Sequence, residues 1–116
     1  MSTDDDTRAA IARFDEAINN HDLEALGEAM TDDCVWEDTA PPDGNRYEGH
    51  AAVLAAMAKF VAGSPNARFE TEELFVAGDR AVLRWRYAWG DGHVRGVDLL
   101  RVRDGRVAES LAYVKG

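Results

Sequence analysis

The stretch RAVLRWRYAWGDGHVRGVDLLRVRDGRVAESLAYV, residues 80–114, decides the fold. It holds three runs rich in β-branched and aromatic residues, separated by a Gly-Asp-Gly at 90–92 and an Asp-Gly at 104–105. Glycine and aspartate tolerate the positive φ angles of tight turns, so each separator predicts a hairpin. A similar run at 68–77 ends at another Gly-Asp pair. The second half of the chain therefore predicts an antiparallel meander with strands at 68–77, 80–89, 94–103 and 106–114.

The first half of the chain has a helical period instead. Apolar residues at helical spacing predict helices over 8–18, 23–30 and 50–62. A short strand at 34–38 and a Pro- and Gly-containing loop at 39–45 fall between the second and third helices. The acidic residues at 4–6 suggest a solvated leader, residues 1–7, ahead of a single domain at 8–116. The sequence thus predicts an α+β domain in which three N-terminal helices cover one face of a curved antiparallel sheet.

Composition and charge narrow the classes of partner. The chain has 116 residues, 46% of them apolar, which is enough to bury a core in one domain. Its formal charge of −9 disfavours nucleic acid and anionic membrane surfaces as partners. No apolar stretch approaches the ~20 residues of a membrane span, and the acidic beginning lacks the apolar core of a secretory signal. With a single cysteine, Cys34, these features predict a cytoplasmic protein.

Strand alternation isolates one acidic residue. In the strand at 94–103 one face carries Val94, Gly96, Asp98, Leu100 and Val102, so Asp98 is the only charged group on an apolar stripe. A carboxyl group in such surroundings must be paired or must take up a proton. Two interpretations stay open: a core aspartate satisfied by backbone donors or an arginine, and an acid of raised pKa inside a cavity.

Aromatic residues fall on the same side of the predicted sheet. Trp85, Tyr87 and Trp89 share one face of the strand at 80–89. Trp36 and Asp38 share one side of the strand at 34–38. The aromatic stripe fits either ordinary core or the walls of a pocket for a flat apolar ligand. Asp38, directly before a Pro-rich loop, fits either a turn residue or a site residue.

Four segments together resemble the SnoaL-like family of the nuclear transport factor 2-like superfamily, which also contains the ketosteroid isomerases. They are HDLEAL at 21–26, TDDCVWED at 31–38, YEG at 47–49 and GVDLLRVRDGRV at 96–107. The resemblance spans residues 8–114 and implies a cone-shaped sheet. This scaffold hosts isomerases, cyclases, dehydratases, epoxide hydrolases and non-catalytic members, so the likeness specifies the fold better than the reaction.

The resemblance also assigns roles to individual residues. Asp38 stands where the isomerases have their general base, and Asp98 where they have a protonated acid in the oxyanion hole. Phe14 stands where they have a tyrosine whose phenol is a second oxyanion donor. Similarity to the polyketide cyclases leaves a second assignment open, in which Asp98 itself is the base.

These observations predict an enzyme that needs no cofactor and carries out acid–base chemistry on a small hydrophobic carbonyl or polyketide-like compound. The reaction would be an isomerisation, cyclisation or dehydration, with Asp38 and Asp98 as catalytic residues. The expected substrate-binding residues are Phe14, Trp36, Tyr47, Trp85, Tyr87, Trp89 and Tyr113, with the phenols of Tyr47 and Tyr113 as replacement donors.

No metal site is expected, because His21, His50 and His93 lack metal-ligand spacing. The alternative function is a non-catalytic ligand-binding or dimerisation module of the same fold. The resemblance further implies a homodimer formed through the arginine-bearing outer face of the sheet.

Overall fold

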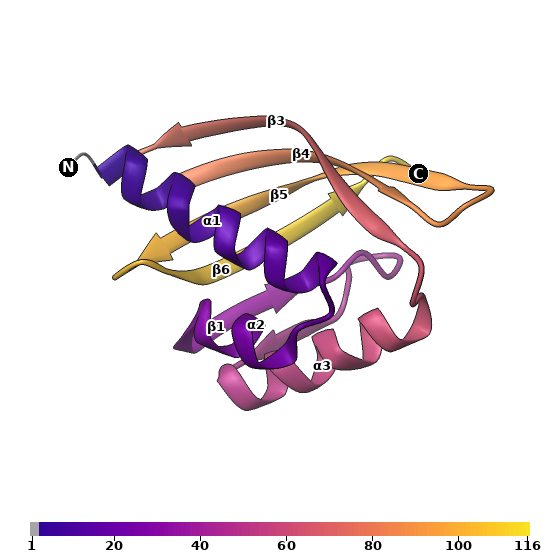
Figure 1. Cartoon of the computed structure of the whole chain (residues 1–116), viewed down its shortest axis with the longest axis horizontal. Helices are drawn as coiled ribbons and strands as arrows, with labels where there is room; N and C mark the ends of the chain where they lie inside the picture. Colours follow the sequence, from indigo (N-terminus) through magenta and orange to yellow (C-terminus); the bar gives the residue numbers. More distant parts are fainter. Residues whose placement is uncertain (1–2) are drawn as a thin grey trace.

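The computed structural model describes residues 3–116 as three helices and a six-stranded sheet (Figure 1). The helices are α1 (Thr3–Asn19), α2 (Leu23–Glu28) and α3 (His50–Gly63). The strands are β1 (Met30–Glu37), β2 (Arg46–Glu48), β3 (Arg68–Ala77), β4 (Arg80–Ala88), β5 (His93–Arg103) and β6 (Arg106–Val114). The predicted α+β class and the meander of β3 to β6 are confirmed.

The sheet has the strand order β2-β1-β6-β5-β4-β3. Neighbouring strands are antiparallel except β1 and β6, which pair in parallel with Trp36 opposite Ser110. The predicted antiparallel sheet is confirmed at the other four strand contacts, and this pair is the exception. No hairpin joins β1 to β6. The turn residues that predict antiparallel pairing within the meander therefore give no information on the relative direction of these two strands.

The acidic residues at 4–6 are exposed to solvent, but they belong to α1 and do not form a separate leader. Helix α1 begins at Thr3, and Thr7 is 1% exposed, with its hydroxyl donating to the Gly78 carbonyl at 2.6 Å. One carboxylate oxygen of Asp4 accepts from the Gly78 N–H at 2.8 Å. Carboxylates in the first turn also interact favourably with the helix dipole. The predicted helix start at residue 8 is thus corrected to Thr3, while residues 1–2 of the predicted leader lie outside the described residues.

Two further boundaries differ from those predicted. Strand β1 starts at Met30, four residues before the predicted start. Helix α2 therefore ends at Glu28, two residues before its predicted end. Strand β2 was not predicted, because its three residues are too few to show an alternation. It pairs with β1 and places Tyr47 opposite Trp36.

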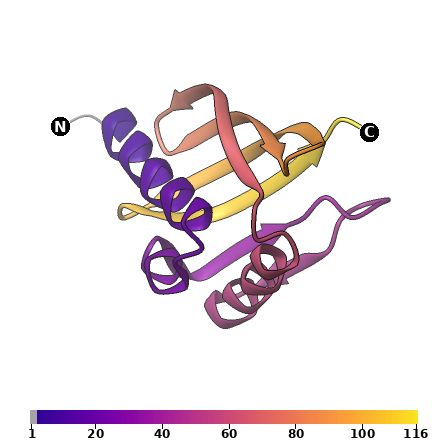
Figure 2. The same ribbon diagram turned by 45° about the vertical axis from the view of Figure 1, so that its right-hand side comes forward.

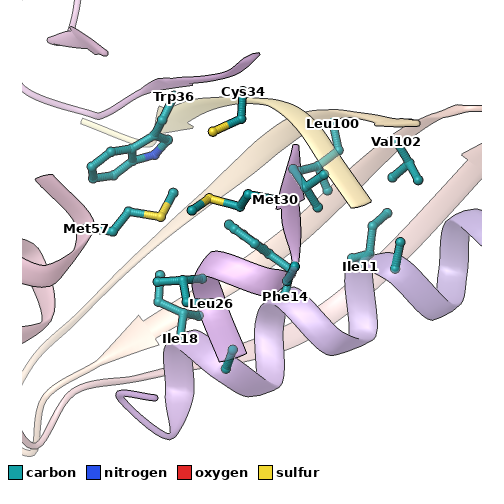
Figure 3. Close-up of a cluster of buried hydrophobic side chains, with 14 of the residues drawn as sticks. Ile11, Phe14, Ile18, Leu26, Met30, Cys34, Trp36, Met57, Leu100 and Val102 are labelled. Atoms are coloured by element: carbon teal, nitrogen blue, oxygen red, sulfur yellow. The ribbon is translucent and has the colours of Figure 1, made fainter. Parts of the chain in front are cut away.

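The helices cover one face of the sheet, which is its inner face. Helix α1 crosses the inner face of the meander, while α3 packs beside β1 and β2 (Figures 1 and 2). Phe14, Met30, Trp36, Met57 and Leu100 belong to the continuous core between these layers (Figure 3). Within residues 3–116, no helix has the length and apolar character needed to cross a bilayer. The homodimer and the cytoplasmic location stay predictions.

Candidate functional site

A cavity of about 450 Å³ lies between α1, α3 and the inner face of the sheet. Aromatic rings make up a large part of its wall, and β1, α3, β3, β4 and the turn after β4 contribute six of them. These rings belong to Trp36, Phe60, Phe69, Trp85, Tyr87 and Trp89. Phe14 and Ile18 of α1 and Met57 of α3 add apolar surface. The polar atoms that reach this apolar space are few, and three carboxyl groups are among them.

Asp98 lies on β5 and faces the cavity from the inner side of the sheet. One of its carboxyl oxygens accepts a hydrogen bond from the indole N–H of Trp85 at 3.1 Å. Burial raises the pKa of Asp98 to about 7; the Trp85 bond opposes this rise and the charge of Asp15 adds to it. Among the described residues no arginine or lysine forms an ion pair with Asp98. Its surroundings match the second of the two interpretations, an acid inside a cavity.

Gly96 allows Trp85 to reach Asp98. Gly96 and Trp85 are opposite one another on β5 and β4. A Cβ atom at position 96 would lie 2.6 Å from the Trp85 ring and 2.2 Å from the backbone oxygen of Tyr113. The absence of a side chain at position 96 therefore lets the indole lie close against β5, where its N–H donates to the carboxyl group of Asp98.

Asp15 is a site residue that the sequence analysis missed. It lies on α1 and lines the same cavity as Asp98. Burial raises its pKa, against the lowering effects of a hydrogen bond with Thr71 and the charge of Arg68. The signal was present in the sequence, because residues 11, 14, 15 and 18 form one inward stripe at helical spacing. Asp15 is the one acidic residue on that stripe, as Asp98 is on β5.

Asp38 directly follows β1, lines the cavity and also organises the next loop. One carboxylate oxygen accepts from the backbone N–H groups of Asn45 at 2.7 Å and Ala40 at 3.1 Å. The other accepts from the Asn45 side-chain amide at 3.2 Å. Partial burial acts to raise the pKa of Asp38, but these three bonds outweigh it and the pKa lies below its ordinary value. Asp38 is thus both a turn residue and a cavity residue, and it is ionised.

Two predicted donors do not line the cavity. Tyr47 lies on the far side of Trp36, stacked on it with ring centroids 5.6 Å apart, and faces a separate surface groove. Tyr113 is 56% exposed and lies on the outer face of the sheet, because Ala112 is the residue opposite Asp98. The expectation that their phenols serve as replacement donors is corrected on this ground. Phe14, Trp36, Trp85, Tyr87 and Trp89 do line the cavity.

Comparison with known proteins gives the family. A model of the SnoaL-like domain matches residues 11–110. The chain belongs to the SnoaL-like family. Among curated proteins, no match to this SnoaL-like chain was found.

Solved structures agree with this assignment. A nuclear transport factor 2-like protein of unknown function from Mesorhizobium loti is 45% identical, with a TM-score of 0.87 over 100% of this chain and 96% of that one. A candidate ketosteroid isomerase from Kribbella flavida is 22% identical, with a TM-score of 0.83 over 100% and 82%. A candidate polyketide cyclase from Sinorhizobium meliloti is 24% identical, with a TM-score of 0.78 over 89% and 92%. The last two likenesses show the fold alone.

In this SnoaL-like domain, the coupling of Asp15 to Asp98 can be measured. Asp15→Asn is expected to lower the pKa of Asp98 below about 7, because it removes a negative charge that disfavours ionisation of Asp98. Carboxyl-carbon NMR titration of both proteins measures this shift. Asp38→Asn is the matched control and should leave the titration of Asp98 in place, since Asp38 does not contribute to that pKa shift. An unchanged Asp98 pKa in Asp15→Asn would contradict the coupling.

Proposed function

We propose that the protein binds a small, largely apolar carbonyl compound in the cavity and transfers a proton to or from it. The reaction would be an isomerisation, cyclisation or dehydration. The observation that carries this proposal is Asp98, a carboxyl group with a pKa of about 7 on the wall of an apolar cavity. A group whose pKa lies near the working pH can both give and take a proton, which is what general acid–base catalysis needs.

The two catalytic carboxyl groups have opposite protonation preferences, which supports separate roles. Asp98, which keeps its proton up to about neutral pH, would donate to the carbonyl oxygen as negative charge develops there. Asp38, held ionised by its loop, would accept a proton from carbon in the cavity. In the second assignment, Asp98 loses its proton and acts as the base itself. The reaction rates of the Asp38→Asn and Asp98→Asn proteins distinguish these two schemes, because the larger loss of rate identifies the residue that acts as the base.

One observation favours a second candidate function, a non-catalytic ligand-binding module. Phe14 lines the cavity but has no hydrogen-bond donor to offer a ligand oxygen. The indole N–H of Trp85 is already directed at Asp98. In such a binding module, the carboxyl groups would contact the ligand and contribute to its recognition without transferring a proton.

Hydrogen–deuterium exchange tests the proposal without knowledge of the natural substrate. Cyclic enones and 3-ketosteroids are incubated with the protein in deuterated buffer, and loss of the proton on the carbon next to the carbonyl is followed by NMR. We expect exchange above the buffer rate, and at least a tenfold decrease in Asp98→Asn. Tryptophan fluorescence reports binding in parallel. Binding without exchange across the panel would reject catalysis and leave the binding module.

A further inference from the structure

We propose that the ligand of the cavity carries a positively charged amine, held among the aromatic rings and against the carboxyl groups of Asp15 and Asp98. The inference rests on the proposed function for one point only, that this cavity binds a small molecule. It adds the charge of the ligand, which the proposed proton transfer leaves unspecified.

The charge of the cavity wall is one-sided. Asp15, Asp38 and Asp98 line the cavity, and within residues 3–116 no lysine, arginine or histidine does. Charged groups buried in apolar surroundings are normally paired with opposite charge. An anionic ligand would find no cationic partner on this wall and would be repelled by ionised Asp38, whereas a cationic ligand would supply the missing partner. The chain's formal charge of −9 also attracts cations from solution.

The aromatic rings suit a cation as well as an apolar body. Tyr87 is central among them, with ring centroids 4.4 Å from Phe69, 5.5 Å from Phe60 and 6.1 Å from Trp89. The face of an aromatic ring attracts an ammonium group that lies within about 6 Å of the ring centroid, so a cavity lined by several rings suits such a group. Aromatic rings beside carboxylates recognise an organic cation more specifically than either group does alone.

Ser110 adds a polar atom that nothing in the fold uses. Its side chain comes from β6 on the inner face of the sheet, is 3% exposed, and lines the cavity. Within residues 3–116, its hydroxyl has no hydrogen-bond partner. No buried side-chain oxygen of the described residues lacks a partner, so the Ser110 oxygen is open to the cavity and available to a ligand group. A serine hydroxyl can accept from the N–H of an amine.

The groups around Asp98 determine how binding depends on pH. Asp15 faces it from α1 and Trp85 from β4, while Asp38 and Tyr87 line the same cavity from the β1 and β4 sides. Arg68 of β3 is exposed and acts on Asp15 from outside the cavity, where Thr71 also contacts Asp15. A bound ammonium group would favour ionised Asp98, so Asp98 should lose its proton as the ligand binds.

A pair of isosteric probes tests the charge directly. N,N-dimethylbenzylamine, protonated through neutral pH, and isobutylbenzene have the same shape and differ in charge. We expect the amine to bind at least tenfold more tightly, measured by tryptophan fluorescence. Its affinity should rise with pH through the Asp98 pKa of about 7, and that of isobutylbenzene should not. Calorimetry in two buffers of different ionisation enthalpy should show that the amine releases about half a proton per site at neutral pH.

Variants separate failure of this inference from failure of the proposed function. Asp98→Asn should remove most of the amine's advantage and its proton release while leaving isobutylbenzene bound. Asp32→Asn, which removes an exposed carboxylate that does not line the cavity, should change neither. If isobutylbenzene binds as well as the amine without proton release, the inferred charge is wrong and the binding cavity stands. If neither probe nor the carbonyl panel binds, the proposed function fails.

Discussion

Gly96→Ala is expected to lower the free energy of unfolding by about 2–3 kcal/mol, measured by urea denaturation. The added methyl group would lie 2.2 Å from the backbone oxygen of Tyr113 and 2.6 Å from the Trp85 ring. Neither neighbour can move freely, since one is strand backbone and the other is a buried indole. The expected loss therefore comes from forced displacement of β6 or of Trp85.

Gly63→Ala is the matched control, because a Cβ atom at position 63 meets nothing within 4 Å. Alanine there should leave stability unchanged or slightly raised. In Gly96→Ala the pKa of Asp98 should also rise, because displacement of Trp85 removes the hydrogen bond that lowers this pKa. Wild-type stability together with an unaltered Asp98 titration would show that the close approach at Gly96 is not required.

The meander and the position of Asp98 could be predicted because both depend on local rules. Strand residues alternate strictly between two faces, and Asp-Gly turns fix where each strand reverses. The parallel contact between β1 and β6 could not be predicted in this way. It joins Trp36 to Ser110, residues far apart in the chain, and depends on how the finished layers pack.

The errors in the candidate site have physical reasons of the same kind. Asp15 was missed although the helical stripe contains it, because the inward face of a helix is broad and does not single out one acidic residue as the strict alternation of a strand does. Tyr113 was misplaced because its face depends on the register of β6 against β5, which puts Ala112 opposite Asp98. Tyr47 lies on an inward-facing position, but Trp36 stands between it and the cavity. The bulk of the Trp36 side chain therefore keeps Tyr47 out of the cavity, and the alternation of strand residues gives no information on such bulk.

Phe14→Tyr is expected to raise 3-ketosteroid isomerase activity by up to about 10²–10³-fold from a low or undetectable level. One well-placed donor to a developing oxyanion contributes about that factor. Phe14 is buried and lines the cavity that Asp98 also lines, so a hydroxyl on its ring is added beside that shared space. The change adds one oxygen and leaves the rest of the α1 stripe unaltered. Ultraviolet absorbance of the conjugated product measures the rate.

The second substitution decides whether that gain is catalysis by the proposed carboxyl groups. Adding Asp38→Asn to Phe14→Tyr should abolish the gain if Asp38 takes the proton from carbon, because no other residue is assigned that role. Adding Asp98→Asn instead should reduce it less, since asparagine still donates a hydrogen bond to the oxyanion. The reverse order of effects would make Asp98 the base, as in the cyclase-like assignment. Isomerase activity in the natural protein would instead require a second donor beside Asp98 other than residue 14, and the hydroxyl groups of Thr39, Tyr87 and Ser110 line the cavity.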